Sequence, residues 1–209
     1  MAALNAVVHV VDDDASMREA LSRLLSAMGF EVRQYESAGD YLLAWPVDAP
    51  GCLLLDVRMP GPSGLDLQLA LARRSDAPPV VFITGYGDIP MSVLAIRRGA
   101  VDFLTKPVDR DLLLAAVTAA LERDMENRAN NRKRQGAREG FATLTPRERA
   151  VFEHVVAGRL NKQIAASLST CERTIKAHRA HVMEKMHVHS VAELVHLAVQ
   201  LELEMASCA

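Results

Sequence analysis

The sequence lacks the features that define several large classes of protein. It holds only three cysteines, Cys52, Cys171 and Cys208, and no CxxC pair, so neither a disulfide framework nor a structural zinc site is indicated. Its longest apolar runs, such as residues 112–121, are shorter than the roughly 20 residues that cross a bilayer. The N-terminus does not resemble a signal peptide, because three aspartates follow a single short apolar run. These absences predict a cytoplasmic protein with no membrane partner and with reduced thiols.

The composition is that of a folded chain with two different halves. Of the 209 residues, 50% are hydrophobic and 24% are charged, which excludes intrinsic disorder. Residues 1–125 carry 11 Lys and Arg against 17 Asp and Glu, whereas residues 126–209 carry 13 against 9. Residues 126–140 contain five basic side chains and only two alanines as apolar residues, which indicates a solvated linker or a frayed helix extension. The sequence therefore predicts domains at 1–125 and 141–209, joined by a linker at 126–140.

The first half alternates strand-like and helix-like segments. Five short apolar or β-branched runs predict strands at Val7–Val11, Glu31–Tyr35, Cys52–Leu55, Val80–Ile83 and Val101–Leu104. The clearest amphipathic stretch between them is Ser16–Met28, which ends at Gly29, and Pro90 and Gly99 bracket another. Apolar strands separated by helices indicate a parallel sheet that is covered on both faces. The predicted fold is therefore α/β and doubly wound.

Polar residues follow four of these strands at the edge where ligands bind in such sheets. Asp12 and Asp13 follow the first strand, Asp56 the third, Thr84 the fourth, and Lys106-Pro107 the fifth. Crowded carboxylates repel one another unless a hard cation such as Mg²⁺ lies among them. The hydroxyl and the ammonium group are suited to hold the oxygens of a phosphoryl group while one carboxylate attacks it. The pattern predicts a site that forms an aspartyl phosphate.

These residues resemble the receiver domain of two-component response regulators, over about the first 120 residues. The resemblance implies a (βα)5 flavodoxin-like fold, with Asp56 as the phosphoacceptor and a sensor histidine kinase as the phosphoryl donor. It implies Mg²⁺ held by Asp12, Asp13, Asp56 and the backbone carbonyl of Arg58. It also implies switch roles for Thr84 and Phe103, phosphoryl contact by Lys106, and a cis peptide bond between Lys106 and Pro107.

Taken singly, the residues of this predicted site have ordinary structural roles open to them. Asp12 to Asp14 could cap a helix, Thr84 could be a strand-end hydroxyl, and Phe103 could belong to the core. An alternative enzyme class is the Mg²⁺-dependent aspartyl-phosphate phosphohydrolases, which also use carboxylates at the rim of a parallel sheet. Their usual Asp-x-Asp-Gly-Thr pattern is absent, because residues 12–16 read Asp-Asp-Asp-Ala-Ser. The joint placement on successive strand ends favours the receiver.

The second half is predicted to be entirely helical. Thr145, Pro146 and Glu148 form a capping-box pattern that predicts the start of a helix running to a stop at Gly158. Asn161 is then expected to cap a helix over Lys162–Leu168. Longer helices are expected at Glu172–Met186 and Val191–Leu201. Two helices joined by a tight turn, the second of them basic, are typical of a helix-turn-helix whose second helix enters the major groove of DNA.

This half resembles the LuxR-type helix-turn-helix over about 65 residues, through the motifs at 144–149, 161–165 and 173–179. The whole chain therefore resembles the response regulators of the FixJ/NarL family, and residues 83–91 favour the FixJ side. The resemblance implies that Lys176, Ala177 and Ala180 face base edges. It places near the DNA backbone Asn161, Lys162, Arg173, Thr174, His178 and Arg179. Ala180 restricts base contact there to apolar groups such as a thymine methyl.

The resemblance implies a transcription factor switched by phosphorylation, more often an activator, with no enzymatic role. Its expected partners are double-stranded promoter DNA, a sensor kinase, RNA polymerase, and a second copy of the chain when phosphorylated. Cys171, His178 and His181 could be imagined as zinc ligands, but they lack a fourth ligand and a closed geometry. A receiver acting only through protein contacts is disfavoured by the complete helix-turn-helix, and a basic helix face could also be merely solvated.

Overall fold

The protein is described by a computed structural model that covers residues 6–44, 50–85 and 89–207, with side chains as far as residue 199. Cys208 and residues 86–88 of the FixJ-like motif lie outside these ranges. The chain forms two compact units, Met1–Ala129 and Asn130–Ala209. In the part of the chain that the structure describes, no helix combines the length and the apolar character needed to cross a membrane.

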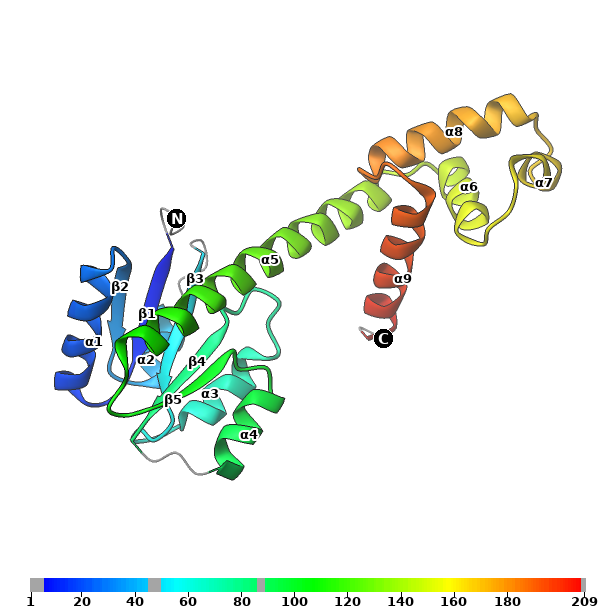
Figure 1. Ribbon diagram of the computed structural model, residues 1–209. Helices are drawn as coiled ribbons and strands as arrows, with labels where there is room; N and C mark the ends of the chain where they lie inside the picture. Colours follow the sequence, from blue (N-terminus) through cyan, green and yellow to red (C-terminus); the bar gives the residue numbers. More distant parts are fainter. Residues whose placement is uncertain (1–5, 45–49, 86–88, 208–209) are drawn as a thin grey trace. The chain divides into compact units, whose positions relative to one another are not determined.

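The first unit is built on a five-stranded parallel sheet (Figure 1). Its strands are β1 (Val7–Val11), β2 (Glu31–Tyr35), β3 (Gly51–Asp56), β4 (Val80–Thr84) and β5 (Asp102–Thr105). Their order across the sheet is β2-β1-β3-β4-β5, so the chain reverses its direction of winding after β2. The predicted doubly wound α/β fold is confirmed, and each strand lies within one or two residues of its predicted range.

Alternating strand residues face two hydrophobic cores. Cys52 and Leu54 belong to a core that includes α1 (Ala15–Ala27) and the first turns of α5 (Arg110–Ala142). Leu53 and Leu55 belong to a second core on the opposite face of the sheet. The helices that close this second core are α2 (Ala38–Ala44), α3 (Gly64–Leu71) and α4 (Ile89–Arg97). Because both faces are covered, the central strands are apolar almost throughout.

Helix α5 is longer than the sequence suggested, because it continues through the expected linker 126–140. Of the two alternatives that the sequence left open, a solvated linker and a helix extension, the structure shows the helix, and most of its residues in this stretch are exposed. Ala137 is only 1% exposed and belongs to the core of the second unit. Gly140 also approaches that unit closely, since a Cβ atom there would lie 2.0 Å from the carbonyl oxygen of Lys185. Small residues at these two positions allow α5 to pack closely, although the surrounding sequence is polar.

The second unit contains four further helices: α6 (Pro146–Val156), α7 (Asn161–Ser167), α8 (Glu172–Lys185) and α9 (Val191–Ser207). Helix α6 begins with the predicted capping box, in which Thr145 and Glu148 bond reciprocally. It ends before Gly158, which has a φ of 75° and so provides the left-handed conformation that stops the helix. Ile164, Ile175 and Val182 form part of one core shared by these helices.

The predicted N-cap of α7 is wrong. Asn161 is the first helical residue and Leu160 occupies the cap position. The Leu160 N–H donates to Gln163 Oε1 at 2.8 Å, while Asn161 Oδ1 accepts a hydrogen bond from Arg179 of α8 at 2.5 Å. The asparagine side chain therefore joins the two helices of the predicted helix-turn-helix instead of capping its own. Helix α9 is also longer than predicted, since it continues beyond Leu201 to Ser207.

A buried histidine lies inside the sheet of the first unit. His9 in β1 is 2% exposed, and its Nδ1 lies 3.1 Å from the hydroxyl oxygen of Tyr35. Its ring also packs edge-on against Tyr41, with 5.7 Å between centroids. Burial, more than the nearby Arg33, lowers the pKa of His9 from 6.5 to about 4. The folded unit therefore favours a neutral imidazole.

We predict that this histidine makes the first unit less stable in mild acid. Because the folded-state pKa is depressed, the unfolded chain binds more protons, and stability is lost as the pH falls from 6.5 toward about 4. His9 is the only histidine in residues 1–125. Its contribution to the free energy of unfolding should fall by about 2 kcal/mol between pH 7.5 and 5. Urea unfolding, followed by the fluorescence of the single tryptophan, Trp45, measures this loss.

The variant His9→Gln should lose that part of the pH dependence, while exposed His189→Gln serves as the control. An unchanged pH dependence in His9→Gln would show that the buried imidazole does not titrate as described.

Candidate functional site

The strand register of the first unit brings two buried carboxylates to one edge of the sheet. Val11 of β1 pairs with Leu55 of β3, so the residues that follow them, Asp12 and Asp56, lie at the same level on neighbouring strands. Both are almost fully buried, at 2% and 5% exposure. Two buried acids this close together require a compensating positive charge.

Lys106, which follows β5, supplies that charge. Its Nζ lies 2.6 Å from Asp12 Oδ2 and 2.9 Å from Asp56 Oδ1. The Lys106 N–H donates to the carbonyl oxygen of Thr84 at 2.8 Å, which fixes the lysine to the end of β4. The Lys106-Pro107 peptide bond is cis, as the resemblance implied. Lys106, at the end of β5, thus contacts the ends of β1 and β3 through its ammonium group and the end of β4 through its backbone N–H.

The electrostatics reflect both burial and ion pairing. Burial raises the pKa of the Asp56 carboxyl above its ordinary value, and the Lys106 ammonium opposes that rise. Burial alone would lower the pKa of Lys106, but its hydrogen bonds to Asp12 and Asp56 outweigh this effect and raise it. The lysine is therefore held in its charged form between the two acids.

Close backbone contacts position the two carboxylates, and the sequence alone does not reveal most of them. Arg18 of α1 donates to the carbonyl oxygen of Asp12 at 2.6 Å, and the Arg58 N–H donates to Asp56 Oδ2 at 2.6 Å. A Cβ atom at Gly64 would lie 2.2 Å from the carbonyl oxygen of Asp56. A glycine is therefore required where α3 begins, and only its place in the folded chain shows this.

The other predicted residues of the first site lie around this centre with different exposures. Asp13 and Arg58 are exposed, whereas Thr84 is 1% exposed at the end of β4. Phe103 is half-buried, with its ring centroid 6.1 Å from that of Phe82. Asp14, by contrast, is an ordinary helix cap, since its carboxylate accepts the backbone N–H groups of Ser16 and Met17. The helix-capping role that was open to Asp12–Asp14 is thus taken by Asp14, and Asp12 instead pairs with Lys106.

The first site has the chemistry that a magnesium ion and a phosphoryl group require. Asp12 and Asp56 offer carboxylate oxygens at one point, with exposed Asp13 next in sequence and open to solvent. Hard oxygen ligands of this kind suit Mg²⁺. The Lys106 ammonium lies 2.9 Å from Asp56 Oδ1, so it is placed to contact an anion bound at that carboxylate. The arrangement fits an oxygen nucleophile, a cation and a phosphoryl group at the same sheet edge.

A second candidate site is the exposed surface of α7 and α8 in the second unit. Ile164, Ile175 and Val182 are buried in the core, so the opposite residues of these helices face solvent. Exposed residues include Lys162, Arg173, Lys176, Ala177 and Ala180, while Asn161, Thr174, His178 and Arg179 are half-buried. Among these nine predicted DNA contacts, Asn161 and Arg179 are joined by their hydrogen bond of 2.5 Å. That bond joins the start of α7 to α8.

Glu148 connects the helices of the second unit, a role beyond the capping that the sequence predicts for it. Its Oε2 accepts from Thr145 at 2.9 Å and from Lys185 of α8 at 2.7 Å, although the side chain is only 6% exposed. The hydrogen bonds from Lys185 and from the Thr145 backbone lower the pKa of Glu148 to about 2. The carboxylate is thus ionised and ties the start of α6 to the end of α8.

Comparisons with known proteins match both units. Residues 8–118 match the family model "Response regulator receiver domain", and residues 142–198 match "Bacterial regulatory proteins, luxR family". Nodulation protein W from Bradyrhizobium diazoefficiens is 48% identical over 96% of this chain and 88% of its own length. The transcriptional regulatory protein FixJ from the same organism is 40% identical over 92% of this chain and 94% of its own. A low-resolution structure of the response regulator StyR shares 43% identity with a TM-score of 0.77, over 94% of this chain and 99% of that one.

We predict that Glu148→Gln destabilises the second unit by about 1–3 kcal/mol, because it leaves Lys185 without a carboxylate partner. The folded pKa of Glu148 lies below its ordinary value of 4.5, so the stabilisation in the wild type is lost as the pH falls from 4.5 toward about 2. Urea unfolding followed by circular dichroism measures the change. Exposed Glu153→Gln on the same helix is the matched control, and equal midpoints for the two variants would contradict the role of Glu148.

Proposed function

This chain belongs to the two-component response regulators that carry a LuxR-type DNA-binding domain, and from that membership we propose that phosphorylation of Asp56 controls its binding to promoter DNA. The observation that supports this most strongly is the contact of one Lys106 ammonium with both Asp12 and Asp56. Residues 1–125 would act as the receiver and residues 141–209 as the DNA-binding domain, with 126–140 as the connection. The matched relative FixJ is a transcriptional regulatory protein, and we propose no separate enzymatic activity.

The proposed chemical step transfers a phosphoryl group from a phosphohistidine of a sensor kinase. A carboxylate oxygen of Asp56 forms a bond to phosphorus while the bond from phosphorus to the histidine nitrogen breaks, which leaves an acyl phosphate and a free imidazole. Asp12, Asp13, Asp56 and the Arg58 carbonyl would hold Mg²⁺, which neutralises charge on the transferred group. Lys106 then contacts a phosphoryl oxygen in place of Asp56 Oδ1, from which its Nζ lies 2.9 Å away.

The switch would follow from this change of partner at Lys106. Thr84 is buried at the adjoining strand end, and its carbonyl oxygen already accepts the Lys106 N–H. We expect its hydroxyl to turn toward the phosphoryl group and Phe103 to follow into the space vacated. Because Phe103 is only half-buried beside Phe82, such a movement changes the surface around β5. That surface would then favour a homodimer.

The proposed output is cytoplasmic regulation of transcription by a dimer on two DNA half-sites. Helix α8 would enter the major groove, with Lys176, Ala177 and Ala180 toward base edges. The other proposed contacts lie nearer the backbone: Asn161, Lys162, Arg173, Thr174, His178 and Arg179. Activation, through contact with RNA polymerase, is the proposed mode. The exposure of the basic residues on α7 and α8 supports this interface.

We predict that Asp56→Asn abolishes phosphorylation, because an amide oxygen cannot form a stable acyl phosphate. The protein is incubated with acetyl phosphate and Mg²⁺, and an adduct is detected by intact mass analysis. Asp66→Asn is the control, since Asp66 only caps α3 from an exposed position. The wild type and the control should gain one phosphoryl group. An adduct of equal yield in Asp56→Asn would show that Asp56 is not the phosphoacceptor.

Two lysine variants separate base recognition from backbone contact. Lys176→Ala should reduce the preference for specific over random duplexes, by about 1–3 kcal/mol, because it removes a contact to base edges. Lys162→Ala should weaken binding to both duplexes and reduce the slope of the salt dependence by about one, since it removes a phosphate contact. Fluorescence anisotropy over a salt series measures both. Equal losses on specific and random DNA for both variants would refute the assignment.

A further inference from the structure

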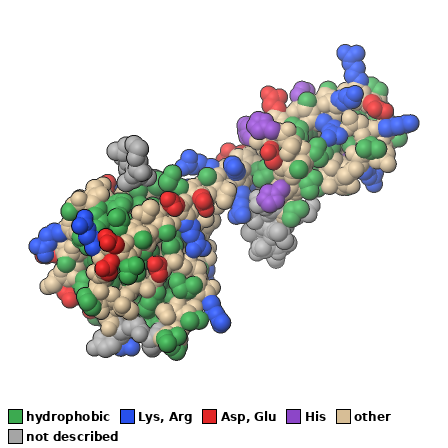
Figure 2. Space-filling view, viewed as in Figure 1, with side chains coloured by type: hydrophobic (Ala, Val, Ile, Leu, Met, Phe, Trp, Pro, Cys, Tyr) green, Lys and Arg blue, Asp and Glu red, His purple; other side chains and the backbone are tan. Residues whose placement is uncertain are grey.

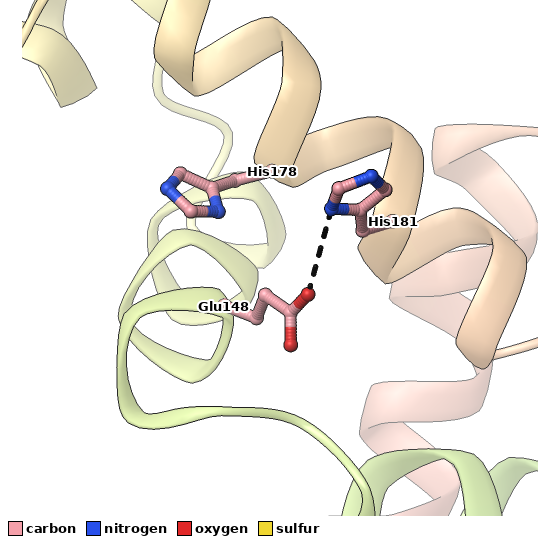
Figure 3. Close-up of side chains that lie close together, drawn as sticks. All are labelled: Glu148, His178 and His181. Carbon is pink, nitrogen blue, oxygen red and sulfur yellow. Dashed lines mark ion pairs between the residues drawn. The ribbon is translucent and has the colours of Figure 1, made fainter.

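Three potential metal ligands meet in the second unit, away from the acidic centre of the first. His178 and His181 lie one turn apart on α8, and Glu148 lies in the first turn of α6. One ligand atom from each residue falls within 4.8 Å of the other two. Figure 3 shows both imidazole rings and the carboxylate directed toward one space between the helices. On the face drawn in Figure 2, histidine side chains appear only on the second unit.

The two oxygens of Glu148 have different surroundings. The hydrogen bonds from Thr145 and Lys185 all end on Oε2. Oε1 instead faces Nδ1 of His181, at 3.7 Å, which is too long for a hydrogen bond. The capping box and the ion pair therefore fix the carboxylate through one oxygen, while the other points toward the two imidazoles. A fixed, ionised carboxylate beside two histidines is a preorganised set of donors.

We propose that Glu148, His178 and His181 form a binding site for a divalent transition-metal cation of the Zn²⁺ class. Two imidazole nitrogens and one carboxylate oxygen are a donor set that Zn²⁺ accepts, with a fourth position left for water. Mg²⁺ is not expected here, because it prefers oxygen ligands alone. The proposal does not rest on phosphorylation, and it shares one residue, His178, with the proposed DNA-binding surface.

The required rearrangement is small. Zn–N distances of 2.0–2.1 Å place tetrahedral ligand atoms about 3.3 Å apart, so these atoms must approach by about 1.5 Å at most. His181 can contribute to this movement, because its side chain is 60% exposed, and its Nδ1 already lies 3.7 Å from Glu148 Oε1. The space beside it is a surface pocket lined also by Glu139, Glu184 and His187, which gives a cation access from solvent.

Two nearby residues, Lys185 and Cys171, do not serve as metal ligands, and the first of them weakens the expected affinity. The Lys185 ammonium lies 2.7 Å from Glu148 Oε2 and opposes a second positive charge, so the affinity should be moderate. Cys171 is not a ligand, because it precedes His178 by seven residues, which is about 10 Å along a helix. Its Sγ instead lies 3.2 Å from the hydroxyl oxygen of Thr174. Glu148, which is distant in sequence from the two histidines, is therefore the third protein ligand of the proposed site.

The test measures metal binding by the full-length protein without DNA or a phosphoryl donor. Zn²⁺ affinity is determined by competition with a chromophoric chelator, and Co²⁺ is added separately for its visible absorption. Excess Mg²⁺ is present throughout to occupy the carboxylates of the first unit. The variants are His181→Asn and His178→Asn, with His189→Asn and Cys171→Ser as controls that leave the three ligands intact. Thermal unfolding confirms that each variant is folded.

We expect one Zn²⁺ equivalent for the wild type and for both controls. His181→Asn and His178→Asn should each weaken binding at least tenfold, since loss of even an outer partner typically costs about 10–100-fold. The wild type with Co²⁺ should show visible absorption that both variants lose. The proposal is overturned if the His181 and His178 variants bind Zn²⁺ as tightly as the wild type, or if Cys171→Ser alone abolishes binding.

Discussion

The ion pairs of Lys106 are the constraint on which the first unit depends. Two nearly buried carboxylates, Asp12 and Asp56, are tolerable side by side because one ammonium lies within 3 Å of each. The parallel register places the acids together, and the lysine reaches them from β5, two strands away from β3. A phosphoryl group on Asp56 would redirect that ammonium. The contact that compensates the two buried acids is therefore the one that the proposed phosphorylation would change.

The second unit depends on a comparable point, where Glu148 is held by Thr145 and Lys185. One oxygen serves the helix start and the link to α8, while the other faces two histidines. In both units a buried carboxylate fixes elements that are distant in sequence, and an exposed or polar surface beside it is available for ligands. In each unit the carboxylate that stabilises the fold is also the one proposed to bind a ligand, so we expect a single charge change there to affect both.

Much of this organisation could be predicted from the sequence, because local patterns determined it. Apolar runs followed by Asp12, Asp56 and Thr84 located the strands and the edge at which their polar residues gather, and a capping box located α6. What could not be predicted depended on contacts between distant residues. Gly64 is needed only because the Asp56 carbonyl lies against it. Asn161 does not cap α7 as expected, because its side chain accepts a hydrogen bond from Arg179. The length of α5 was obscured by a polar, basic stretch whose few small residues pack closely.

Phosphorylation of the first unit is proposed to change DNA binding by the second. The most direct measurement is the affinity of the wild type, fully loaded with phosphoryl groups by intact mass, for a duplex selected by the phosphorylated protein from random sequences. The unloaded protein is measured in parallel at the same Mg²⁺ and salt concentrations. We predict that phosphorylation tightens binding, by about 5–150-fold for a coupling free energy of typical size. Equal affinity of the loaded and unloaded proteins would contradict it.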